Sequence, residues 1–134
     1  MAFDAFFLTA VLDEIRKKAI GARVEKIHQP GRDTVILLLR CEGSREKLIF
    51  APNPAAPRLH LTTANPENPD QPPMFCMLLR KHLGGAFLTD VRQEGFERVA
   101  VFEFGTRDEM GFDCKKLLIA EIMGKNSNLI FANE

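Results

Sequence analysis

The sequence contains no tryptophan and no tyrosine, so its only aromatic residues are 11 phenylalanines. Polar-tipped aromatic side chains dominate many binding hot spots, so we expect most of these phenylalanines to be core residues. The chain also has no net charge, because 18 Lys and Arg balance 18 Asp and Glu. A neutral chain has no global field that attracts nucleic acid or acidic membranes, so an anionic partner requires a local basic patch.

Segments that cross or target membranes are lacking as well. No apolar run approaches the roughly 20 residues of a membrane-spanning helix. Asp4 interrupts the apolar N-terminus and the first basic residues come late, which is unlike a secretory signal. The three cysteines are odd in number and have no C-x-x-C spacing, which favours free thiols over a disulfide framework. We therefore expect a cytoplasmic protein with no membrane partner.

Sequence motifs for catalysis and metal binding are also missing. There is no G-x-S-x-G, H-E-x-x-H, P-loop or G-x-G-x-x-G motif. His28, His60 and His82 are far apart, and none has a second ligand three or four residues away, which argues against zinc. Cys76 and His82 are six positions apart and would face different directions on a helix, so Cys76 is expected to be a core thiol. We expect no enzymatic activity, no catalytic residues, no metal and no cofactor.

The clearest structural pattern is a helix over residues 73–83. Pro73 suits the first position of a helix, and Gly84-Gly85 offers a left-handed stop. A three-to-four spacing of apolar residues predicts one buried face. That face would hold Met74, Phe75, Leu78, Leu79, His82 and Leu83. A second amphipathic helix is predicted from Asp4, as its N-cap, to Gly21.

The rest of the chain is predicted to form about seven or eight strands. They fall near residues 22–29, 34–40, 46–51, 58–62, 86–91, 99–104, 115–123 and 128–131. Pro30-Gly31 is predicted to be a turn, and Gly105–Gly111 a charged hairpin tip. The expected fold class is α+β, a β-sandwich of mostly antiparallel strands with two helices. We expect residues 1–134 to form a single domain that is an N-terminal fragment of a longer chain.

Several charged residues have both a structural and a functional interpretation. Asp4 is either an N-cap or a carboxylate that meets a nucleotide edge or a basic partner. Glu97-Arg98 follows Gly95 at a predicted strand entrance, where Arg could bind phosphate or guanine and Glu could orient its fork. The alternative is an exposed ion pair of little energetic consequence. Arg58, Arg80 and Lys81 are equally ambiguous, and solvated positions are favoured for them.

Several stretches together resemble a known family. They are MAFD (1–4), VEKIHQP (24–30), APNP (51–54) with PRLHLT (57–62), PPMFCMLLRKHL (72–83) and EIMGKNSN (121–128). In order and spacing they resemble the N-terminal (NFACT-N) domain of the RqcH/NEMF family, whose bacterial members were long labelled fibronectin-binding proteins. The resemblance covers essentially the whole chain.

The resemblance implies a fold and a function. The family domain is similar to the β-sandwich N-terminal domain of formamidopyrimidine-type DNA glycosylases. Family members bind the obstructed large ribosomal subunit with its peptidyl-tRNA and recruit tRNA, alanyl-tRNA in bacteria, to extend the stalled chain. This predicts a non-enzymatic domain that binds tRNA and the large ribosomal subunit in ribosome-associated quality control.

The resemblance also assigns candidate tRNA-binding residues. An Asp-Arg dipeptide that the family needs for tRNA recognition aligns with Glu97-Arg98, so Arg98 is retained and Glu replaces Asp. Asp4 matches an acidic residue near the start of the family domain, although Ala5 follows it where many relatives have glycine. We therefore expect Glu97, Arg98 and Asp4 to bind tRNA.

Two alternatives remain. The first is a surface adhesin that binds fibronectin or fibrinogen, against which the missing secretion signal and the free cysteines argue. The second is a DNA-binding, glycosylase-like domain. That enzyme requires an N-terminal proline nucleophile followed by glutamate, whereas this chain begins Met1-Ala2-Phe3.

Overall fold

The computed structural model describes residues 5–31, 34–51, 58–62, 70–94, 99–121 and 128–133. The helices are α1 (Ala5–Ala19) and α2 (Met74–Leu83). The strands are β1 (Arg23–Gly31), β2 (Thr34–Cys41), β3 (Ser44–Ala51), β4 (Arg58–Thr62), β5 (Phe87–Gln93), β6 (Val99–Arg107), β7 (Asp113–Glu121) and β8 (Asn128–Asn133). All neighbouring strands are antiparallel, in the order β4-β3-β2-β1-β5-β6-β7-β8. The predicted α+β class, with eight strands and two helices, is confirmed.

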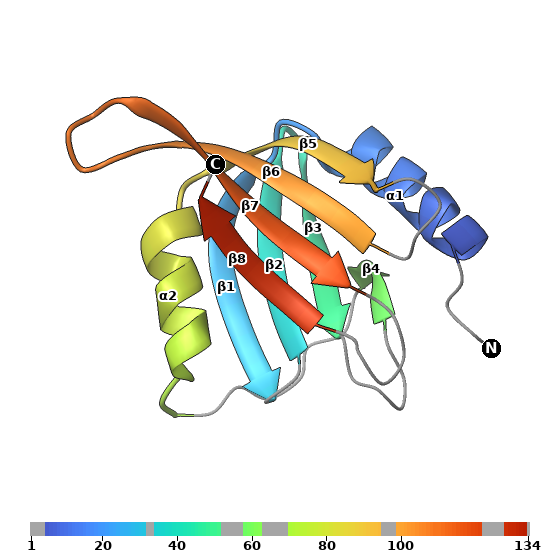
Figure 1. Cartoon of the computed structure of the whole chain (residues 1–134), viewed down its shortest axis with the longest axis horizontal. Coiled ribbons are helices and arrows are strands. Elements are labelled where there is room, and N and C mark those ends of the chain that lie inside the picture. The colour runs from blue at the N-terminus through green and yellow to red at the C-terminus, as the bar shows by residue number, and fades with distance from the viewer. Residues whose placement is uncertain are drawn as a thin grey trace.

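The sheet folds over on itself into two facing halves. The halves β4–β1 and β5–β8 are joined at one register position, where Arg23 of β1 lies opposite Phe87 of β5. Figure 1 shows β6, β7 and β8 crossing in front of β1, β2 and β3. Phe50 of β3 meets Phe102 of β6 edge to face, with ring centroids 5.0 Å apart. One continuous sheet thus supplies both layers of the predicted sandwich.

The two helices pack against different parts of the sheet. On α1, Leu8, Leu12 and Ile15 are completely buried at three-to-four spacing, as predicted, and the helix packs against β2, β4 and β5. On α2, the ring of His82 lies 5.2 Å from that of Phe131 in β8, and the helix packs against β1 (Figure 1). The helices therefore border the sandwich on separate sides.

Residues 35–37 of β2 and residues 48–51 of β3 are buried on both faces of the sheet, whereas Arg40 and Arg45, towards the other end of these strands, are exposed. Leu37 and Leu48 are opposite one another and point into the main core. Ile36, Ile49 and Ala51 form a second, smaller cluster. Because successive side chains of a strand alternate between faces, this cluster lies on the outer side of the sheet.

Two predicted turns differ from the structure. Pro30-Gly31 ends β1 rather than forming a turn, at a point where the pairing with β2 shifts register and proline's missing N–H is tolerated. The β6–β7 hairpin is also longer than predicted, with Arg107 paired to Asp113. Its tip closes where the Asp108 Oδ1 atom accepts hydrogen bonds from the backbone N–H groups of Met110 (2.9 Å) and Phe112 (3.0 Å).

Helix α2 buries less than its sequence pattern predicts. Cys76, Leu79 and Leu83 are completely buried, whereas Met74 is 88% exposed and Leu78 is 41% exposed. Pro73 is the N-cap residue, immediately before the first helical residue, with φ −59° and ψ 158°.

The phenylalanines differ in exposure: Phe50, Phe102 and Phe104 are buried, whereas Phe87 and Phe112 are exposed. Neither helix in the described part of the chain is long and apolar enough to span a membrane.

Candidate nucleic-acid interface

The predicted tRNA-binding residues Asp4, Glu97 and Arg98 lie outside the described residues. The structure describes the chain directly after Asp4 and on both sides of residues 95–98. Helix α1 starts immediately after Asp4. Strands β5 and β6 bracket residues 95–98, and the backbone N–H of Glu94 donates to the carbonyl of Val99 at 3.0 Å.

These flanking elements meet at one corner of the domain. The hydroxyl of Thr9 on α1 donates to Oε1 of Gln93, the last residue of β5, at 2.6 Å. Arg16 Nε, further along α1, donates to the carbonyl of Val91 in β5 at 2.7 Å. Figure 1 shows the end of β5 and the start of β6 beside α1. The segments that carry Asp4 and Glu97-Arg98 are therefore connected to elements that lie next to one another.

The described side chains of this corner carry little free positive charge. Arg92 lies 3.3 Å from an oxygen of Asp90 and 3.9 Å from oxygens of both Glu94 and Glu103. Glu103 also pairs with Lys115 at 3.8 Å. Such partly exposed pairs contribute little to stability, but they neutralise the cations that an anionic ligand needs.

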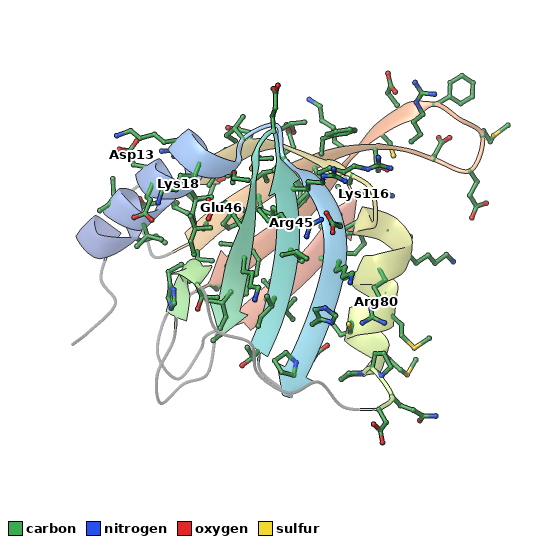
Figure 2. All side chains as sticks on the ribbon, turned by 180° about the vertical axis from the view of Figure 1, so that it is seen from behind. Asp13, Lys18, Arg45, Glu46, Arg80 and Lys116 are labelled. Carbon is green, nitrogen blue, oxygen red and sulfur yellow. The ribbon has the colours of Figure 1, made fainter. Side chains whose placement is uncertain are left out.

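Arg80 was predicted to be a solvated residue at a helix end, but it connects α2 to β1. Its Nε atom donates to the carbonyl of Ile27 at 2.9 Å, and the Cys76 thiol approaches the same carbonyl at 3.6 Å. Figure 2 shows Arg80 on the β1 side of α2. A recess forms between the two elements, lined by Val24, Glu25, Lys26, Ile27, His28, Arg80 and Gly84. No signal in the sequence indicates this contact, because it joins residues 53 positions apart.

Electrostatics in this recess favour a neutral histidine. Burial, and then the positive charges of Arg80, Lys26 and Lys47, lower the pKa of His28 below its ordinary value. Positive charges from α2, β1 and β3 therefore all act on one ring. These positive charges would offset the desolvation cost of an anion that bound among them.

Cys76 occupies the core, as predicted, and does not pair with His82. Burial raises the pKa of the Cys76 thiol, and the charge of Arg80 and a backbone hydrogen bond from Gln29 offset part of that effect. Cys41 and Cys114 are free thiols as well. Within the described ranges, no three His, Cys, Asp or Glu side chains come together as a potential metal site.

Comparison with known families gives one clear match. The family model "NFACT N-terminal and middle domains" matches residues 4–134. The "Rqc2 homolog RqcH" of Bacillus subtilis is 41% identical over 133 residues, which cover 99% of this chain and 23% of the relative. The human "Ribosome quality control complex subunit NEMF" is 28% identical over 110 residues, 82% of this chain and 10% of the relative. The chain thus spans less than a quarter of the length of these two relatives.

Solved structures of similar sequence share the fold. The N-terminal domain of the fibronectin-binding protein PavA from Streptococcus pneumoniae matches with a TM-score of 0.95 and 34% identity, over 99% of this chain and 50% of that one. The N-terminal part of the fibronectin/fibrinogen-binding protein from Streptococcus suis also has a TM-score of 0.95, with 36% identity over 99% of this chain and 50% of that one.

Proposed function

This chain belongs to the NFACT family, and from that membership we propose that it is a tRNA- and ribosome-binding domain of a ribosome quality-control factor. Relatives from bacteria to humans are named as Rqc2 homologs or as subunits of the ribosome quality control complex. The domain would bind the large ribosomal subunit holding a peptidyl-tRNA and recruit tRNA, alanyl-tRNA in bacteria. It would act as a binding factor rather than an enzyme, in the cytoplasm where ribosomes work.

The tRNA site is proposed to comprise Arg98, with Glu97 as its partner and Asp4 nearby. The observation that carries this site is the hydrogen bond between Thr9 and Gln93, which joins the elements next to both segments. The planar guanidinium of arginine can donate two parallel hydrogen bonds to a phosphate or to a guanine edge. A neighbouring carboxylate can hold that guanidinium in position or accept from a base amino group.

Sequencing of co-purified RNA tests the proposal. The wild-type chain, Arg98→Ala, Glu97→Ala and the control Arg107→Ala would be purified from cells at one salt concentration. Arg107 serves as the control because it sits at the exposed β6–β7 hairpin and pairs with Asp113 at 3.6 Å. We expect enrichment of tRNA and large-subunit RNA with the wild type and the control, and loss of tRNA with Arg98→Ala.

Other outcomes would contradict defined parts of the proposal. If RNA from the wild type equals background, the tRNA-binding function is wrong. If both site variants retain tRNA, the function stands but the assignment of Arg98 and Glu97 is wrong. Circular dichroism of each variant would show that the fold is intact.

Adhesion is the second candidate function, because the two solved structures described above are named as fibronectin- or fibrinogen-binding proteins. Binding of the chain to immobilised fibronectin, with albumin as the control surface, would distinguish the two functions. Saturable fibronectin binding without RNA enrichment would favour adhesion.

A further inference from the structure

We infer that the outer face of strands β1–β3, together with Arg80 of α2, is a second RNA-binding surface that holds the phosphate backbone. This "basic face" comprises Arg23, Lys26, Arg40, Arg45, Lys47 and Arg80. The inference rests on the proposed function for its choice of RNA among polyanions. It concerns a surface separate from the corner next to Glu97 and Arg98.

The strand register places these cations on one side of the sheet. Arg23 lies opposite Arg40, and Arg40 lies opposite Arg45, so three arginines form a row across β1, β2 and β3. In the next row on the same face, Lys26 and Lys47 flank Leu38. The rows are two residues apart along β2 and β3, or about 6.6 Å, and three residues apart along β1, where the pairing with β2 shifts register between Val24 and Lys26. A flat array of this kind suits an extended polyanion better than a single small anion.

The row of arginines is unfavourable for folding. Like charges directly opposite one another on a sheet destabilise it. Only one carboxylate offsets them within the described residues: Glu25 pairs with Arg45 at 3.6 Å, whereas no ion pair is found there for Arg40. A local conflict of this kind is expected where function rather than stability selects the residues. An RNA phosphate at Arg40 would remove the conflict.

Arg80 extends the charge from the sheet to the helix. Its Nε atom is held by the carbonyl of Ile27, a neutral acceptor, so its charge is not cancelled by that bond. It faces the recess that Lys26 and His28 also line. In Figure 2, Arg45 lies near the middle of the view and Arg80 on α2 at the right, whereas Lys18 of α1 lies at the left.

Neutralising the basic face tests the inference. The double variant Lys26→Gln/Arg40→Gln would be compared with Lys17→Gln/Lys18→Gln, which removes the same charge from α1. Binding of bulk tRNA would be measured by fluorescence anisotropy over a range of salt concentrations. We expect the basic-face variant to bind roughly tenfold more weakly or worse, with a salt slope smaller by about 1.5, since each phosphate contact contributes about 0.7–0.9. The α1 variant should bind like the wild type.

Stability supplies an independent readout. Removing the central arginine of the row, in Arg40→Gln, should leave the urea midpoint equal to or above that of the wild type while weakening tRNA binding. A purely structural role for Arg40 predicts the opposite, a lower midpoint. The chemical shift of His28 should also move on tRNA titration, because a bound phosphate would raise its pKa.

The outcomes separate this inference from the proposed function. Unchanged tRNA affinity in the basic-face variant would overturn the inference and leave Arg98 unaffected. Weakened binding in that variant, with normal binding by Arg98→Ala, would support the inference and reject the Arg98 site. If the wild type bound heparin but no RNA, the inference that the polyanion is RNA would be overturned.

Discussion

Single residues in this domain are constrained by tertiary contacts that their neighbours in sequence lack. Leu78 and Leu79 are adjacent on α2, yet Leu79 is completely buried and Leu78 is exposed. The helical spacing predicted both to be buried. The spacing defines an apolar side of the helix, but it cannot show how much of that side β1 covers. Similarly, no local pattern predicts that Arg80 reaches Ile27.

The adjacent leucines give a matched stability test. Leu79→Ala should lower the free energy of unfolding by about 2–5 kcal/mol, because it leaves a cavity in the core. Leu78→Ala should lower it by less than about 1 kcal/mol, since exposed positions tolerate truncation. Urea unfolding followed by circular dichroism measures both values. Equal losses would contradict the buried position of Leu79.

Protonation of His28 should couple to stability. Its pKa is lowered in the folded chain, so the unfolded chain binds the proton more readily. The contribution of neutral His28 to the free energy of unfolding is complete above the ordinary histidine pKa. It is lost as the pH falls through the lowered pKa of the folded chain. Arg80→Gln should raise the pKa of His28, whereas Lys81→Gln, whose charge is not among the causes, should change it less. NMR titration of the ring protons measures this, and an unchanged pKa in Arg80→Gln would contradict the account.

At the scale of elements, most boundaries could be predicted because they depend on local chemistry. The β2–β3 hairpin and the end of α2 at Gly84-Gly85 follow from turn and stop residues. Pro30 was predicted wrongly because its tolerance depends on the irregular pairing of β1 with β2. The three opposed arginines likewise follow from register across strands, which a single sequence does not specify.

The connection from α2 to β5 should be sensitive to glycine substitution. Gly85 has φ +80°, and an added Cβ would lie 3.3 Å from Nη2 of Arg23. Gly85→Ala should therefore destabilise the fold by about 1 kcal/mol or more. Gly31→Ala is the control, because an added Cβ meets nothing within 4 Å and φ is not left-handed there. Thermal unfolding should show a lower midpoint for Gly85→Ala only.

At the scale of the whole molecule, zero net charge conceals an uneven distribution. The basic face carries six cations, of which Arg45 pairs with Glu25, whereas the corner beside β5 pairs Arg92 with Asp90, Glu94 and Glu103. Composition predicts that an anionic partner would need a local patch, but it does not indicate where such a patch lies. The predicted site residues Asp4, Glu97 and Arg98 came from the family resemblance, and they remain predictions.

Ultraviolet cross-linking of tRNA to the wild-type chain, with mass spectrometry of the linked peptides, tests the account most directly. We predict salt-sensitive cross-links in two regions, the peptide containing Glu97-Arg98 and the peptides of the basic face around Lys26 and Arg40. Cross-links confined to other surfaces would contradict the claim that this domain binds tRNA through these residues. A cross-linking yield no higher than that of a non-binding protein would contradict it as well.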